Sequence, residues 1–113
     1  MTKTEKKIDK AIREALTLAC DDILARVAGF EWLTHQVDFK NVAGTLKVIC
    51  IFDTQTAQAN ALCEQENKKM IQLIQTRLVS IGIHLKATRQ IRFDNEERCI
   101  AEHGGNWALR LAC

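Results

Sequence analysis

The chain has 113 residues, of which 47% are hydrophobic and 27% charged, values typical of a globular domain rather than of a disordered chain. A chain of this length forms one domain, and we expect a single domain over residues 1–113 that needs no disulfide or structural metal. The net charge of +2 is too small to indicate nucleic-acid binding by itself.

The charge is nevertheless distributed unevenly along the chain. Residues 1–13 contain five basic and two acidic side chains, and residues 14–66 contain three basic and eight acidic ones. Residues 67–92 contain six basic side chains and no acidic one. This segregation is the main indication of function, because clustered basic residues attract polyanions.

The five cysteines are odd in number and form no CxxC pair, which argues against a disulfide framework or a zinc ribbon. They are Cys20, Cys50, Cys63, Cys99 and Cys113. The first three lie in apolar stripes and are expected in the core. No apolar segment follows the first lysines, and no apolar run is long enough to span a membrane. We therefore expect a cytoplasmic protein without membrane contact.

The N-terminal segment predicts a long amphipathic helix that ends near Gly29. Thr2 and Glu5 have the spacing of a capping box, and apolar residues then recur every three or four positions. The opposite face is basic and contains Lys3, Lys6, Lys7, Lys10 and Arg13. This face is either solvated or an anion-binding surface, and the sequence leaves both interpretations open.

Two strands are predicted next, joined by a turn over residues 41–44. Residues 33–39 alternate between apolar and polar side chains, as in a half-buried strand, and place His35 on the apolar side. The run TLKVICIFDT is apolar on both faces and indicates a central strand. Together they predict an antiparallel hairpin.

A second long helix is predicted next, with Asp53, Thr54 and Thr56 as candidate caps and Gly82 directly after its end. A third strand follows over residues 84–93. The buried stripe expected for the helix comprises Leu62, Cys63, Met70, Ile74, Leu78 and Ile81. The strand is expected to direct Phe93 toward the core, like Phe52 of the central strand. Its outer face is expected to be basic, through Lys86 and Arg92. Arg89 is the one residue that breaks the alternation, and it adds a third basic side chain to the strand.

A short helix over residues 94–103 and a final turn containing Trp107 complete the predicted order, α-β-β-α-β-α. This order predicts an α+β fold in which a small three-stranded sheet is covered on one face by the two long helices. The other face would be open, with Lys86, Arg92 and Lys47 projecting from it. The direction of the third strand is not determined by the sequence.

Catalytic motifs are absent from the sequence: there is no GxSxG, phosphate-binding glycine loop or HExxH. We therefore predict no enzyme activity and no cofactor. Cys99 and His103 have the spacing of two metal ligands on a helix, but no second pair exists, so no metal site is expected. A small ligand pocket lined by Trp32, His35 and Trp107 is a further hypothesis.

Two resemblances add to this interpretation. The element order, and the IRFD that ends the third predicted strand, resemble type II KH-like domains and ribosome-binding factor A. The strings TKTEKKIDKAIREAL, GFEWLTH, VICIFDT, RFDNEERCIAEHGG and NWALRL resemble a family of small uncharacterised bacterial proteins sometimes labelled Fis-type transcriptional regulators. That label implies a nearly all-helical protein, whereas strands are predicted here. The second resemblance implies one intact domain in the bacterial cytoplasm and no particular site residue.

The sequence thus predicts a non-catalytic binding or regulatory domain whose partner is RNA or DNA. Contact would be made through the basic face of the first helix or through the third strand, by neutralising phosphates without reading bases. The alternative is a protein-interaction module that uses the open sheet face for a homodimer or another protein partner.

Overall fold

The computed structural model describes residues 2–112 and has an α+β fold, as the sequence predicts. Its elements are α1 (Lys3–Leu24), β1 (Phe30–Gln36), α2 (Val42–Thr45), β2 (Lys47–Phe52), α3 (Gln55–Cys63), α4 (Glu66–Val79), the 3-10 helix η1 (Thr88–Gln90), β3 (Ile91–Asn95), α5 (Glu96–His103) and α6 (Trp107–Ala112). The capping box of Thr2 and Glu5 begins α1, with both hydrogen bonds formed. Cys113 lies outside the described residues.

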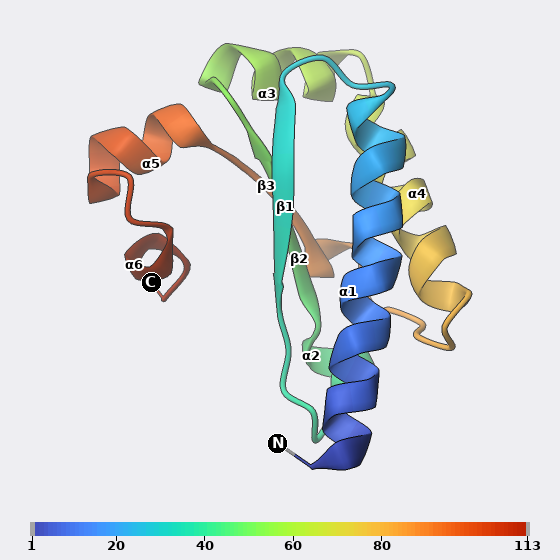
Figure 1. Ribbon diagram of the computed structural model, residues 1–113. Coiled ribbons are helices and arrows are strands. Elements are labelled where there is room, and N and C mark those ends of the chain that lie inside the picture. The colour runs from blue at the N-terminus through green and yellow to red at the C-terminus, as the bar shows by residue number, and fades with distance from the viewer. Residues whose placement is uncertain (1, 113) are drawn as a thin grey trace.

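The sheet has the strand order β1-β2-β3, so β2 is central (Figure 1). β1 pairs with it antiparallel, which confirms the predicted hairpin. β3 pairs with β2 in the parallel direction. Parallel neighbours need a long crossover, and here α3 and α4 provide it.

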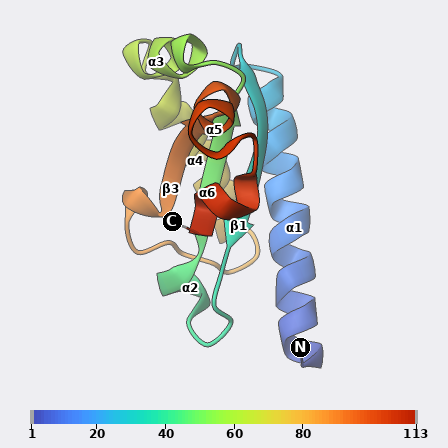
Figure 2. The ribbon, with the colours of Figure 1, turned by 90° about the vertical axis from the view of Figure 1, so that its left-hand side faces the viewer.

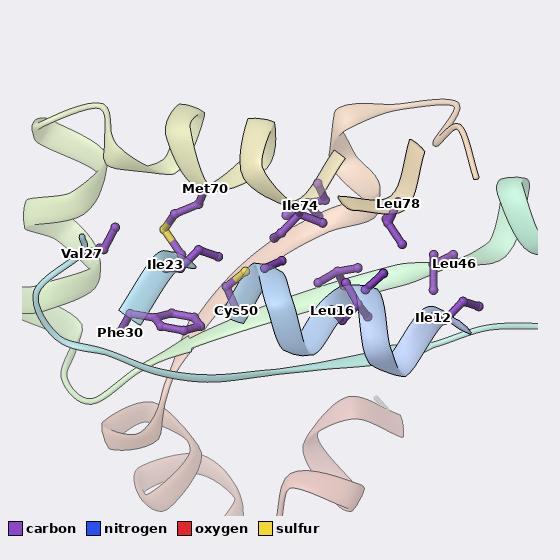
Figure 3. Packing of buried hydrophobic residues seen from close by; sticks show 14 of the residues in the cluster. Ile12, Leu16, Ile23, Val27, Phe30, Leu46, Cys50, Met70, Ile74 and Leu78 are labelled. Carbon is purple, nitrogen blue, oxygen red and sulfur yellow. The ribbon is translucent and has the colours of Figure 1, made fainter. Parts of the chain in front are cut away.

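The first face of the sheet packs against α1 and α4 (Figure 1). In register, this face presents the rows Leu33, Cys50, Phe93 and His35, Val48, Ile91. The core between sheet and helices is drawn in Figure 3 and includes Ile12, Leu16, Ile23, Phe30, Leu46, Cys50, Met70, Ile74 and Leu78. Phe52 is also buried there, and Phe93 packs against the same cluster, as predicted.

The second face of the sheet was expected to be open, and this expectation is wrong where α5 and α6 lie over it (Figure 2). Figure 2, viewed from the side of α5 and α6, shows both helices in front of the sheet. Ile49 and Ile51 point toward this face and are 4% and 0% exposed. An apolar central strand needs cover on both sides, and α5 and α6 supply it at the end near Ile51.

The predicted third strand over residues 84–93 is wrong over residues 84–90, because the strand begins only at Ile91 and continues to Asn95. The preceding backbone is bound by the side chain of Gln90 instead of by a neighbouring strand. Gln90 Oε1 accepts hydrogen bonds from the amides of Lys86 and Ala87, both at 2.8 Å. Lys86 and Arg89 therefore lie in a loop and in η1, and of the three predicted basic residues only Arg92 is in the strand.

The predicted second long helix is two helices in the structure, α3 and α4. The break lies at Gln65, whose φ of 59° is left-handed and ends a regular helix. α3 lies across the end of the sheet, whereas α4 runs beside α1 (Figure 1). Met70, Ile74 and Leu78 are buried as predicted. Leu62 and Cys63 are exposed, because the change of direction at Gln65 turns the end of α3 away from the core. Ile81 is exposed because it lies beyond the end of α4 at Val79.

Two smaller predictions also change. The turn after β1 contains the short helix α2, which Asn41 caps by accepting a hydrogen bond from the Gly44 amide. Of the three cysteines expected in the core, Cys50 is buried and Cys20 is half-buried, but Cys63 is exposed, so the prediction is wrong for Cys63. All four described cysteines are free, and none forms a disulfide within residues 2–112.

Replacing Gln90 tests the role of its side chain in the loop before β3. Besides accepting from the two amides, Gln90 donates from Nε2 to the carbonyls of Ala43 and Leu46, at 2.9 and 3.0 Å. Gln90→Met keeps the shape but leaves these groups unpaired, which should lower the free energy of unfolding by about 2 kcal/mol or more. Urea denaturation measures this, with the exposed Gln72→Met as control. Equal stability of the two variants would contradict it.

Candidate nucleic-acid interface

The second sheet face contains a polar groove of about 320 Å³ beside α5 and α6. Strands β1, β2 and β3 supply its floor, and α5 and α6 supply one wall. We call it the basic groove, because four of its nine lining residues are cations and only one is an acid. Its lining is Gln36, Lys47, Ile49, Arg92, Phe93, Asp94, Arg98, Arg110 and Leu111.

The strand register explains why Lys47 and Arg92 meet in the basic groove. Arg92 is paired with Ile49, and Lys47 lies two residues before Ile49 on the same face of β2. Strand geometry then places the two Cα atoms about 8 Å apart. Both side chains are exposed, and within residues 2–112 neither forms an ion pair.

The other two cations of the groove are partly or wholly neutralised. Arg98 Nε lies 3.1 Å from a carboxylate oxygen of Glu102. Arg110 forms two parallel hydrogen bonds to Asp94, with Nε to Oδ2 at 2.6 Å and Nη2 to Oδ1 at 2.9 Å. The positive charge open to a ligand therefore comes mainly from Lys47 and Arg92.

The Arg110 pair also sets the protonation of Asp94. Burial alone would raise the pKa of Asp94, but hydrogen bonds from the Arg110 guanidinium outweigh it and hold the pKa below its ordinary value. Asp94 is therefore ionised at neutral pH, and its charge holds α6 to β3 rather than opposing Lys47 and Arg92.

The loop with Lys86 and Arg89 lies at the same end of the sheet as the basic groove. Gln90 connects that loop to the carbonyl of Leu46, the residue directly before Lys47. Lys86 and Arg89 are exposed, and neither forms an ion pair within the described chain. The structure thus brings the predicted basic residues of the 84–93 segment close to Lys47.

The basic face of α1 is a separate surface, since α1 packs against the first face of the sheet (Figure 1). All five predicted residues, Lys3, Lys6, Lys7, Lys10 and Arg13, are exposed. Arg13 lies 3.0 Å from Asp9 and Lys10 lies 3.9 Å from Glu14. On α1, therefore, Lys10 and Arg13 have acidic partners, whereas Lys47 and Arg92 have none among the described residues.

Of the predicted pocket residues, Trp32 and Trp107 meet and His35 does not join them. The two indole rings are edge to face, with centroids 5.3 Å apart. Both indole N–H groups donate to Glu96, at 2.6 Å from Trp32 and 2.9 Å from Trp107. With its hydrogen bonds satisfied inside the protein, this cluster holds α5 and α6 on the sheet.

His35 lies on the opposite face of β1, toward α1. Its Nε2 is 3.8 Å from Oδ1 of Asp9, and its side chain is 18% exposed. Burial lowers the pKa of His35, and the Asp9 carboxylate offsets this only in part. His35 also lines a shallow groove beside α1 that includes Trp32 but not Trp107.

The other features to consider among the described residues are a reactive thiol, a metal site and a membrane-spanning helix. Burial raises the pKa of the Cys50 thiol to about 12, so it remains protonated and a poor nucleophile at neutral pH. Within residues 2–112, no three His, Cys, Asp or Glu side chains are grouped to hold a metal ion. The same residues include no helix that is both long and apolar enough to cross a bilayer.

Sequence reasoning did not find Gln36, Arg98 and Arg110 as parts of the groove. They come from β1, α5 and α6, and only the packing of the C-terminal helices on the second sheet face brings them together. A signal was present in Asp94 and Arg110, an acid and a base on neighbouring elements, but such pairs are too common in sequences to identify a contact.

Comparisons with protein-family models, curated proteins and solved structures found no match for this chain. The interpretation of the site therefore depends on its own geometry.

The lowered pKa of His35 predicts how stability changes with pH. Because the folded state binds the proton less tightly than the unfolded state, stability should fall as pH drops below about 6.5, the ordinary histidine value. His35→Gln should remove this part of the decline. Urea denaturation of both proteins at pH 8 and pH 5 measures it. A wild-type protein that loses no more stability than the variant would contradict it.

Replacing Glu96 tests how α6 is held. Glu96→Gln leaves one amide oxygen for two indole donors, so it should lower the free energy of unfolding by about 1–3 kcal/mol and shift tryptophan emission to longer wavelength. Glu31→Gln, an exposed neighbour of Trp32, is the control. Unchanged emission and stability in Glu96→Gln would show that the indole contacts do not hold the helix.

Proposed function

We propose that this protein is a non-catalytic domain that binds nucleic acid by neutralising phosphates in the basic groove. One observation supports this above all others. Lys47 and Arg92 stand side by side on the uncovered part of the sheet, exposed and without an acidic partner among the described residues.

The chemistry of the groove suits phosphates. Phosphate contacts are made mainly by lysine, arginine and polar side chains, and Gln36 adds an amide to the two free cations. Two basic side chains whose Cα atoms lie about 8 Å apart on neighbouring strands can contact phosphates of the same strand of nucleic acid. Binding of this kind releases counterions, so it weakens steeply with salt and shows little dependence on sequence.

Lys86 and Arg89 extend the proposed surface. Their loop is fastened beside Lys47 by Gln90, so a polyanion in the groove would continue along this loop. The resemblance to type II KH-like domains also favours a nucleic-acid partner, although it supplies no residue of the groove. The basic face of α1 lies on the other side of the sheet and is not part of the proposal.

The alternative function is a protein-interaction module that pairs through the sheet. The structure offers less free surface for this than the sequence predicts, because α5 and α6 lie over part of the second face (Figure 2). Gln58 Nε2 also donates to the carbonyl of Phe93 at 3.4 Å, on the side of β3 that faces α3. Nucleic-acid binding is therefore the better supported function.

The proposal is tested by charge reversal in the groove. A Lys47→Glu, Arg92→Glu double variant should bind fluorescein-labelled RNA or DNA at least about tenfold more weakly at low salt. Its affinity should also depend less on salt, by a log–log slope of about 0.7–0.9 for each phosphate that the variant no longer neutralises. Fluorescence anisotropy at two salt concentrations measures both quantities, and circular dichroism checks that the variant is folded.

Two comparisons make the result specific. Lys68→Glu with Lys69→Glu reverses the same charge on α4, away from the groove, and should have a smaller effect. Lys86→Glu should weaken binding without unfolding the protein, if the loop extends the surface. Absence of wild-type binding at tens of micromolar protein and low salt would refute the proposed function, as would equal weakening in the α4 variant.

A further inference from the structure

An apolar pocket of about 280 Å³ lies next to the basic groove, on the other side of β3. Phe52, Ala61, Leu62 and Phe93 supply its apolar surface, and α3 and the start of α5 enclose it. Phe52 is fully buried, whereas Leu62 at the mouth is 64% exposed. The pocket therefore has a dry floor and an open entrance.

Polar side chains lie at defined positions around this pocket. Asn95, which is 1% exposed, donates from Nδ2 to Oε1 of Gln58 at 2.7 Å. Its Oδ1 accepts from the amide of Arg98 at 2.7 Å. Asn67 also lines the pocket, and its side chain takes part in no hydrogen bond among the described residues. A mostly apolar pocket with a few fixed amides suits a flat heterocycle with polar edges.

The pocket and the basic groove share two lining residues, Phe93 and Arg98. A ligand can therefore occupy both only if a charged part and an apolar part are joined by a short link. An unpaired nucleotide has this construction, with its phosphate on one side and its base on the other. A base within a duplex is stacked and paired and is not free to enter a pocket.

We propose that the apolar pocket accepts one unpaired base of a single-stranded nucleic acid whose phosphates lie in the basic groove. This inference rests on the proposed function and adds its substrate class. The pocket, at about 280 Å³, is slightly smaller than the sites that hold drug-sized ligands, which suits one base rather than a stack of several. The Asn67 side chain, which lines the pocket, supplies an amide for a polar edge of the base.

The test compares strands that have the same phosphates but different bases. A fluorescein-labelled ten-nucleotide single strand should bind at least about fivefold more tightly than an abasic strand of the same length, the lower end for one base on an aromatic surface. It should also bind more tightly than the same sequence as a duplex. RNA and DNA versions of each strand distinguish a contribution of the ribose hydroxyl.

Two variants locate the effect. Ala59→Met places a longer side chain of good helix propensity at the pocket wall, and it should reduce the affinity of the normal strand to that of the abasic strand. Phe93→Leu removes the ring while keeping an apolar side chain, and it should also reduce the affinity for the normal strand. Thr56→Met, on the same helix and exposed, is the matched control. A 2-aminopurine in the strand should change its fluorescence with wild-type protein but not with Ala59→Met.

The possible failures are distinguishable. Salt-dependent binding that is equal for normal and abasic strands, and unchanged in Ala59→Met, would overturn the pocket inference and leave the phosphate groove in place. Failure of the wild-type protein to bind any strand at low salt would overturn the proposed function, and the pocket inference with it.

Discussion

The central strand β2 must be covered on both of its faces, and the rest of the structure depends on this requirement. Its residues from Val48 to Phe52 are all nearly or fully buried, so neither face can be left to water without a large loss of hydrophobic stabilisation. α1 and α4 cover one face. α5 and α6 cover the other at the end near Ile51. At the other end, where the basic groove lies, polar side chains of the groove such as Arg92 cover Ile49 instead.

The two covers are built differently. α1 and α4 pack through aliphatic side chains such as Ile12, Leu16 and Ile74, as amphipathic helices do. α5 and α6 are short and are fastened by polar contacts, the two indoles on Glu96 and the paired Arg110 and Asp94. The charged side chains that hold α6 to the sheet, such as Asp94 and Arg110, also line the basic groove. The same contacts that cover β2 therefore make the neighbouring groove polar.

The sequence predicted what depends on local periodicity. The cap at Thr2, the stripe of α1, the hairpin and the apolar centre of β2 follow from spacing alone. The break at Gln65 could not be predicted, because no glycine or proline marks it in the sequence. The loop before β3 could not be predicted either, because Gln90 also binds the distant carbonyls of Ala43 and Leu46. The alternation in residues 84–90 resembles a strand, but Gln90 binds its amides and β2 offers pairing only from Val48 onward. For the same reason Arg92 was found as a candidate, whereas Arg98 and Arg110 were not.

The parallel pairing of β2 with β3 has a consequence for the folding kinetics. Val48 is paired with Ile91, so this contact closes a loop that contains α3 and α4, whereas the β1–β2 hairpin closes a short one. Long-range closure slows folding because its entropic cost precedes any gain from contact. Lys47 and Arg92 become neighbours only through this pairing. A partly folded chain that has the hairpin and α1 therefore lacks the groove, and binding would report completion of the fold.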